Sequence, residues 1–342
     1  MPKTVRIAAV QMDAFPAPVP ERLARAAELV SRAAGAGAEL VVLPEVFNTG
    51  YEYNERNYGL AETFAGPTAA WMSATAARYQ IYLAGTFLRA EASDIYNTML
   101  LVAPDGQRWH YDKSYPWAWE RAYFRPGTGP AVADTPLGKI GMLICWDVAH
   151  PALWQKYAGK VQLMLVSSCP PNVFGSDFVL PDGKRLASQR LGPLVRSIKR
   201  ASDPIFGEFL RRQAAALGVP FAQATSTGTF SSTLPAPKRS LAMLASLYPS
   251  LLRYHATIDQ LRVETDYFNE TCLVDAAGVV LKRVTPGLEG YVLDNVTLPG
   301  TPPLARGRQP SFGLPAYAYL FDALANAILA AEYRNKTRKE QA

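Results

Sequence analysis

The sequence of 342 residues predicts a layered fold of the α/β or α+β class. In the first two thirds of the chain, short apolar runs typical of strands alternate with segments whose apolar residues recur at helical spacing. Later segments of strand type follow one another across tight turns, as they do in antiparallel pairs. This order of elements predicts sheets that are covered by helices.

The N-terminal half contains most of the alternation. Residues 21–34 place apolar side chains on one helical face, and Gly66-Pro67-Thr68 begins a second helix over 66–79. A turn at Pro104-Asp105-Gly106 separates two strands. The strands predicted for this half cover residues 5–11, 39–43, 81–89, 96–103 and 107–113.

The C-terminal half continues the pattern and ends in antiparallel pairs. Helices are predicted from Pro151 and over 204–217, and residues 271–284 form a hairpin around Ala276-Ala277-Gly278. The other predicted strands are 139–145, 161–167, 220–225 and 291–298. The basic stretch 183–200 is predicted to be an insertion with a solvated surface, and recruitment of an anionic substrate or an acidic membrane is the alternative.

Composition limits the class of protein. Hydrophobic residues make up 49% and charged residues 19%, as in ordinary globular enzymes. A net charge of +6 and the lack of any nucleic-acid-binding signature argue against a nucleic-acid partner. Three cysteines are too few for a disulfide framework, and no signal-peptide pattern opens the chain, so we expect a cytoplasmic protein.

We expect a single domain over residues 1–310, because no linker divides the chain. Residues 311–342 are predicted to form a C-terminal helix and a basic tail that dock on the body or contact another subunit. The apolar stretch 314–331 is interrupted by Pro315, Asp322 and Asn326, which argues against a transmembrane segment.

Three reactive side chains each follow an apolar run of strand type. Glu45 follows Leu43-Pro44, Lys113 follows Tyr111-Asp112, and Cys145 follows Leu143-Ile144. Strand ends can meet at one edge of a sheet, where a base, a cation and a thiol could attack a carbon–nitrogen bond. Taken one at a time, a solvated acid, a solvated amine and a packed thiol are the commoner interpretations.

Together these strings resemble the nitrilase (carbon–nitrogen hydrolase) superfamily. The resemblance spans most of the chain, and its order and spacing make chance agreement improbable. The matching strings cover residues 5–12, 43–51, 111–113, 124–127, 141–147 and 291–298.

The resemblance implies a four-layer α-β-β-α sandwich of two mixed sheets. It also implies a catalytic centre of Glu45, Lys113 and Cys145, with Glu120 as a second glutamate that supports the lysine. No metal and no organic cofactor is expected. A homodimer or a higher homo-oligomer is implied.

The expected reaction proceeds through a covalent intermediate on Cys145. Glu45 accepts and returns the protons, and Lys113 with the backbone N–H of Trp146 stabilises the anion. We expect a helix start after Cys145 to lower the pKa of its thiol. Tyr51, Trp117 and Trp146 are predicted to line the substrate pocket, with ordinary core packing as the alternative for the first two.

The expected function is therefore that of a thiol-dependent hydrolase that cleaves a small amide or N-carbamoyl compound. A nitrilase is one alternative, because residue types alone do not separate an amide substrate from a nitrile. A non-catalytic binding protein on the same fold is the other alternative. A Cys145–His150 dyad is a weaker alternative, since such dyads usually take their histidine from a distant part of the chain.

Overall fold

The computed structural model describes residues 1–307 and 313–340, with no side chains described for 337–340. Its centre is a strongly twisted, 12-stranded assembly that divides into two mixed sheets. In the first sheet β1, β2 and β3 are parallel and the outer strands antiparallel. Its strands, in order, are β5 (Arg108–Asp112), β4 (Asp94–Val102), β3 (Tyr82–Glu91), β2 (Leu40–Val42), β1 (Lys3–Asp13) and β16 (Gly290–Leu298).

The second sheet has the same design, with a parallel centre and antiparallel edges. It joins the first sheet only at one corner, where Met12 and Asp13 of β1 pair with Ser226 and Thr227 of β11. Its strands, in order, are β6 (Val132–Thr135), β7 (Gly138–Ile144), β8 (Leu163–Ser168), β11 (Phe221–Thr227), β14 (Cys272–Val274) and β15 (Val280–Arg283).

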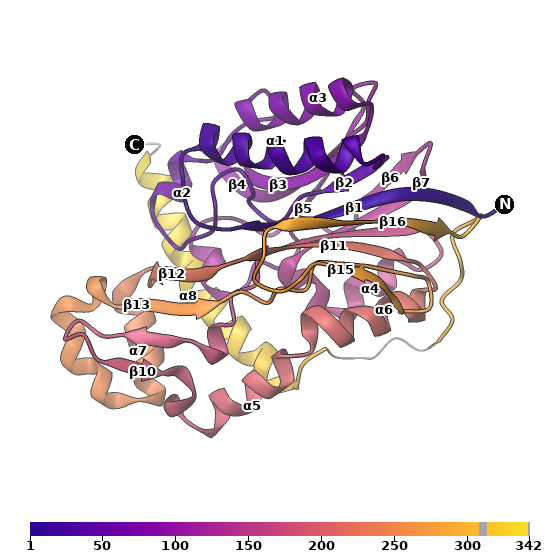
Figure 1. The fold of residues 1–342 in the computed structure, drawn as a ribbon. Helices are drawn as coiled ribbons and strands as arrows, with labels where there is room; N and C mark the ends of the chain where they lie inside the picture. Colours follow the sequence, from indigo (N-terminus) through magenta and orange to yellow (C-terminus); the bar gives the residue numbers. More distant parts are fainter. Residues whose placement is uncertain (308–312, 341–342) are drawn as a thin grey trace.

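Helices cover the outer faces of both sheets, which gives the four layers seen in Figure 1. Helices α1 (Val19–Gly35) and α3 (Pro67–Tyr79) lie on the first sheet, and α4 (Pro151–Tyr157) and α6 (Leu210–Leu217) lie on the second. Along β1, Ile7 belongs to the core between the sheets, whereas Ala8 belongs to the core under α1 and α3. This period of two confirms the predicted α-β-β-α sandwich.

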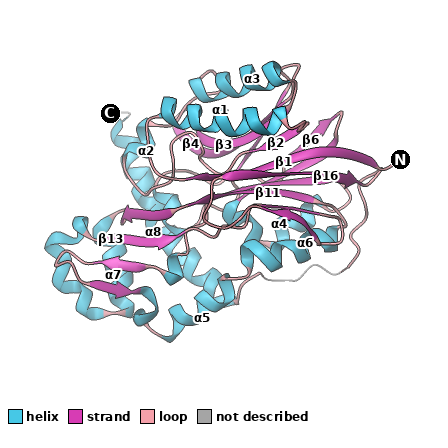
Figure 2. Ribbon diagram, viewed as in Figure 1, coloured by secondary structure: helices cyan, strands magenta, loops and turns pink. Residues whose placement is uncertain are grey.

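A smaller unit, seen at the lower left of Figures 1 and 2, extends from one end of the sandwich. Sequence analysis missed this unit and the edge strand β6. Its four-stranded sheet has the order β10 (Arg185–Ala187), β9 (Asp177–Val179), β13 (Arg262–Asp266) and β12 (Thr229–Thr233). Its helices are α5 (Pro193–Ser202), α7 (Pro237–Leu247) and a 3₁₀ segment, η6 (Pro249–Gln260).

The stretch 183–200, predicted as a basic surface insertion, forms part of this smaller unit. Arg185 lies in β10 and pairs with Asp177 and Glu264, while Lys199 of α5 pairs with Asp203. Arg190 and Arg196 are exposed. Neighbouring acidic side chains therefore neutralise part of the positive charge of the stretch 183–200.

The C-terminal helix α8 (Ala316–Glu340) packs on the body. Asp322 accepts a hydrogen bond from the backbone N–H of Ala118, and the Tyr333 hydroxyl accepts one from that of Ile95. Leu320 and Leu324 of the same helix are about 60% exposed. The predicted boundary between residues 310 and 311 lies outside the described residues, as do the side chains of the basic tail from residue 337 on.

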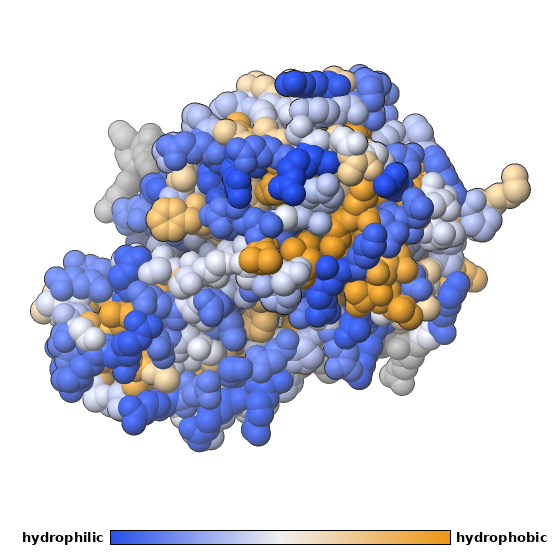
Figure 3. Space-filling model, in the orientation of Figure 1, coloured by the Kyte–Doolittle hydropathy of each residue, from blue (hydrophilic) through white to orange (hydrophobic). Residues whose placement is uncertain are grey.

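The surface is otherwise largely hydrophilic on the face drawn in Figure 3, with apolar residues gathered over the region of β15 and β16. Among the described residues, no helix combines the length and the apolar character needed to cross a bilayer. Short helical elements include α2 (Arg56–Gly59), the 3₁₀ turns η3 (Val173–Gly175) and η4 (Ser188–Leu191), and the π-helical turn η5 (Ile205–Phe209) that precedes α6.

Candidate active site

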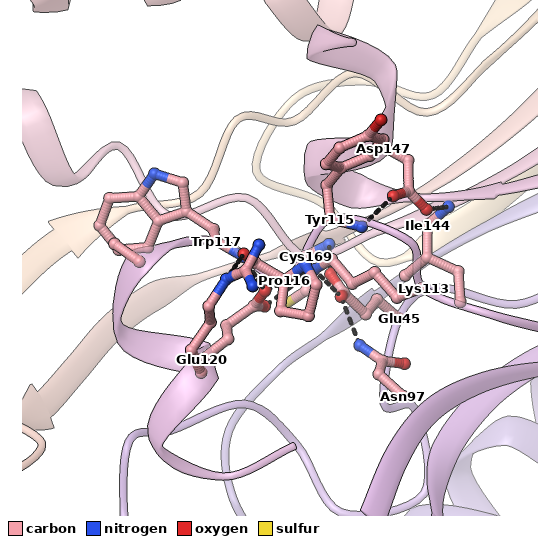
Figure 4. Close-up of polar contacts among 12 residues, drawn as sticks. Glu45, Asn97, Lys113, Tyr115, Pro116, Trp117, Glu120, Ile144, Asp147 and Cys169 are labelled. Carbon is pink, nitrogen blue, oxygen red and sulfur yellow. Dashed lines mark hydrogen bonds and ion pairs between the residues drawn. The ribbon is translucent and has the colours of Figure 1, made fainter. Parts of the chain in front are cut away.

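The structure brings the reactive side chains together where three strands end. Glu45 lies just after β2, Lys113 directly after β5 and Cys145 directly after β7. The Lys113 ammonium lies 2.8 Å from Glu45 Oε1, and 2.9 and 2.7 Å from the two carboxylate oxygens of Glu120. Figure 4 shows Glu45, Lys113 and Glu120 pointing toward one another. The two sheets thus bring residues that are far apart in sequence into one ionic cluster.

Glu45 is held on several sides. Its Oε1 also accepts a hydrogen bond from Asn97 Nδ2 at 2.7 Å, and its Oε2 accepts one from the Cys169 backbone N–H at 2.8 Å. The side chain is 1% exposed. Burial raises the pKa of Glu45 above its usual value, against the lowering effect of Lys113. A raised pKa makes this carboxylate a stronger base than an ordinary glutamate.

Lys113 stays charged although it is fully buried. Burial alone would lower the pKa of the ammonium, but Glu120 and Glu45 raise it well above its usual value. All of its N–H donors face these two carboxylates. Glu120, in the 3₁₀ helix η1 (Ala118–Ala122), also accepts hydrogen bonds from the Tyr51 hydroxyl and the Trp117 backbone N–H. Glu120 therefore fixes the ammonium from the side opposite Glu45.

Cys145 is the first residue of the 3₁₀ helix η2 (Cys145–Ala149) and is 5% exposed. Burial raises the pKa of the thiol well above its usual value, and the charge of Glu45 raises it further. The prediction of a lowered thiol pKa was therefore wrong, because burial and a neighbouring carboxylate outweigh the dipole of one short helical turn. A neutral thiol needs a base that removes its proton. Glu45 is the neighbouring carboxylate, and a hydrogen bond with Cys145 lowers its pKa slightly against the effect of burial.

The backbone is strained at two points of this site. Cys145 has a φ of +47° and Val46, next to Glu45, a φ of +44°. Residues other than glycine rarely adopt positive φ values, and such backbone strain often accompanies functional positions. The Val46 backbone N–H donates to the buried Thr86 hydroxyl at 2.7 Å, which helps to fix this turn.

Asp147 connects η2, which begins with Cys145, to strand β5 and the residues that follow Lys113. The sequence did not predict this role. Its carboxylate accepts hydrogen bonds from the backbone N–H groups of Ile144 and Tyr115 and from the Tyr111 hydroxyl. Burial raises the pKa of Asp147 to about 6. Asn97 was missed as well, because a buried amide on a strand carries no local sequence signal.

A cavity opens beside Cys145 and provides about 40 Å³ of room for water-sized groups. Tyr51, Trp117 and Trp146, which sequence analysis predicted as substrate-binding, all line it, together with Glu120 and Cys145. The indole N–H of Trp146 is buried and has no hydrogen-bond partner in the described part of the chain. The rest of the lining is mostly apolar, with two polar side chains among its members, and consists of Tyr53, Pro170, Pro171, Asn172, Val173, Phe174, Ser202, Phe206 and Phe268.

His150 has a structural environment. Its ring stacks on Tyr115 with the centroids 3.7 Å apart, and burial, with Arg121 as a second cause, lowers its pKa to about 3. A neutral, stacked imidazole fits the packing interpretation better than a Cys145–His150 dyad. Within residues 1–307 and 313–336, no group of three or more His, Cys, Asp and Glu side chains is arranged to hold a metal ion.

Several curated proteins are similar to this chain in sequence. The chain spans about half the length of the curated relatives it matches. The bifunctional nitrilase/nitrile hydratase NIT4 of Oryza sativa is 31% identical over 182 residues, which cover 46% of this chain and 50% of that protein. The omega-amidase NIT2 of Danio rerio is 35% identical over 158 residues, which cover 43% of this chain and 56% of that protein.

Solved structures are similar in fold. A Cys-to-Ser mutant of an amidase from Nesterenkonia AN1 superposes with a TM-score of 0.62 at 19% identity, covering 84% of this chain and 90% of that one. A CN-hydrolase superfamily protein from Xanthomonas campestris, with an arsenic adduct in its active site, gives 0.61 at 17% identity, covering 96% and 97%. The family model of carbon-nitrogen hydrolases matches residues 6–305, and the chain belongs to that family.

Proposed function

We propose that this protein hydrolyses the carbon–nitrogen bond of a small amide or N-carbamoyl compound through a thioester on Cys145. The observation that carries the proposal is a thiol at the wall of a cavity, backed by a buried Glu45–Lys113–Glu120 cluster. Membership of the carbon-nitrogen hydrolase family supports the same reaction class.

The first half of the reaction transfers the acyl group to sulfur. Glu45 accepts the thiol proton, and the sulfur of Cys145 forms a bond with the carbonyl carbon, whose oxygen becomes negative. The carbon–nitrogen bond then breaks, and Glu45 gives its proton to the departing amine or ammonia. The thioester remains on Cys145 and Glu45 is a carboxylate again.

The second half releases the acid. Glu45 accepts a proton from water, whose oxygen attacks the thioester carbon, and the carbon–sulfur bond breaks. The sulfur regains a proton from Glu45, and the carboxylic acid leaves. Protons and bonds balance over the cycle, because one water is consumed and one acid and one amine are produced.

Lys113 supplies a fixed positive charge to both anionic intermediates. Its donors face Glu45 and Glu120 in the resting state. When Glu45 becomes protonated, its hold on the ammonium weakens, and one N–H can turn toward the developing oxyanion. The backbone N–H of Trp146 is the second proposed donor to the oxyanion. The indole N–H of Trp146, which has no partner among the described residues, is a further donor at the cavity.

Nitrile hydrolysis is the second candidate, because several of the similar curated proteins are named nitrilases. The same sulfur would add to the nitrile carbon, and two waters would be needed to release acid and ammonia. If the protein only bound a ligand, the Glu45–Lys113–Glu120 cluster beside Cys145 would have no catalytic role.

An ammonia-release assay over amides, N-carbamoyl compounds and nitriles tests the proposal. We expect release from an amide or N-carbamoyl compound in the wild type and none in Cys145→Ala. Cys272→Ala, which removes another buried thiol outside the cavity, should stay active. Release from nitriles alone would favour the nitrilase, and no release from any compound would overturn hydrolysis.

Three further expectations stay proposals. We propose a homodimer or a higher homo-oligomer, which sedimentation of the full chain tests, and a cytoplasmic location, which fractionation tests. The division into a catalytic domain over 1–310 and a C-terminal helix with its tail is tested by deleting residues 311–342 and measuring the unfolding transition.

A further inference from the structure

A second cavity adjoins the Cys145 cavity. It provides about 60 Å³ of room for water-sized groups and lies between η1 of the sandwich, the smaller unit and α8. Trp117, Val173 and Phe174 line both cavities. The outer walls come from Phe178 of β9, Leu191, Val195 of α5, Met243 and Leu244 of α7, and Phe321 of α8.

The partition between the two cavities is made of side chains. The Trp117 ring meets Phe174 and Trp146 edge to face, with centroids 6.3 Å apart in both pairs, and meets Trp119 at 5.5 Å. Trp117 and Phe174 are both only partly buried. In Figure 4 the Trp117 indole is directed away from Glu45 and Lys113. A substrate that reaches from the first cavity into the second must displace these side chains, and changes of rotamer are fast for partly exposed side chains.

The chemistry of the second cavity selects an apolar occupant. Its two hydroxyl side chains are already engaged, since Ser188 donates to the Phe174 carbonyl and Ser240 donates to the Pro235 carbonyl. None of the described residues that line it is charged. A charged group placed there would lose its hydration without meeting an opposite charge, whereas hydrocarbon would gain by burial.

We propose that the second cavity binds an apolar arm on the acyl side of the substrate, so that the preferred substrates are primary amides of aliphatic acids with a medium-length chain. This inference rests on the proposed function. The reacting carbonyl sits at Cys145 with ammonia as the small leaving group, and the chain passes Trp117 and Phe174 toward Met243. The smaller unit thus determines chain-length specificity, while the sandwich supplies the reaction.

The test measures kcat/KM for acetamide, butanamide, hexanamide and octanamide. Burial of a methylene contributes about 0.8 kcal/mol, so each methylene that enters the second cavity should raise kcat/KM about fourfold. Values that stay flat or fall with chain length would overturn the proposal.

Variants locate the effect. Met243→Trp fills the second cavity and should reduce the octanamide-to-acetamide ratio of kcat/KM roughly tenfold or more, the value of about two lost methylenes. Ala242→Trp adds the same side chain at an exposed position of the same helix and should leave the ratio unchanged. Met243→Ala widens the cavity and should move the optimum to a longer chain, which keeps the test decisive if Met243→Trp does not fold.

Binding separates this inference from the proposed function. Calorimetry with the Cys145→Ala protein should show octanamide binding more tightly than butanamide, and Met243→Trp in the same background should remove the difference. Length-dependent binding without any turnover would support the cavity and overturn hydrolysis. Turnover of amides without dependence on chain length, in rate or in binding, would support hydrolysis and overturn the cavity.

Discussion

The two sides of the Cys145 cavity differ in their physical character. On one side, Glu45, Lys113 and Glu120 form a charged cluster whose members are at most 1% exposed. On the other side, the lining is mostly apolar, and Pro171, Phe174 and Phe268 are partly exposed. Strand ends and the 3₁₀ helix η1 hold the charged side, whereas the smaller unit and short loops form the apolar side. Under the proposed function, reaction chemistry and substrate choice are carried by separate parts of the fold.

Loss of the base should have the largest effect on the charged side. Glu45→Gln keeps the size of the side chain but cannot accept a proton, so kcat should fall by roughly 10²–10⁴-fold with little change in KM. Steady-state ammonia release measures both constants. Glu55→Gln, at an exposed carboxylate, serves as the control. A value of kcat within tenfold of the wild type would mean that Glu45 is not the base.

Removal of the central cation should destabilise the fold as well as the reaction. Lys113→Met leaves two buried carboxylates without their partner, which typically costs about 3–5 kcal/mol of unfolding free energy. Urea unfolding measures this cost. Arg185→Met breaks two exposed ion pairs in the smaller unit, with Asp177 and Glu264, and should change stability little. Equal losses in the two variants would contradict the contrast between buried and exposed pairs.

Asp147 gives the charged side a pH dependence. Its pKa is raised from 3.8 to about 6, so between these values the folded state binds more protons than the unfolded state. The free energy of unfolding therefore falls as pH rises through this window. The difference between the two pKa values of Asp147 corresponds to roughly 3 kcal/mol. In Asp147→Asn this contribution should disappear. The comparison is made by urea unfolding at pH values from 4 to 7, and identical pH profiles for the two proteins would contradict it.

The smallest effect is expected at His150, which lies near the site but belongs to its packing. His150→Phe keeps the stack on Tyr115 and should change stability by less than about 1.5 kcal/mol. The rate of ammonia release should stay close to that of the wild type. A fall of 10²-fold or more, as for loss of a catalytic base, would revive the Cys145–His150 dyad.

The charged side could be predicted from sequence because its signals are local. Each of Glu45, Lys113 and Cys145 directly or closely follows a strand, and the order of the predicted strands indicated a sheet whose strand ends meet. The family resemblance added Glu120 and the four layers. Their catalytic roles stay predictions until the variants are measured.

The apolar side could not be predicted in the same way. Strands β9 and β10 have only three residues each, and β9 pairs with β13, more than 80 positions later in the chain. Such short strands carry too little periodicity to identify, and their pairing depends on distant residues. The thiol pKa was predicted with the wrong sign for a related reason, since burial and the charge of Glu45 become known only in the folded protein.

The central claim is that the sulfur of Cys145 carries the acyl group, and mass spectrometry tests it most directly. Wild-type protein is mixed with hexanamide, quenched in acid during turnover and digested. The account predicts a hexanoyl adduct on the peptide that contains Cys145, and no such adduct in Cys145→Ala. An acyl group on another residue, such as Cys169, or ammonia release by Cys145→Ala at the wild-type rate would contradict it.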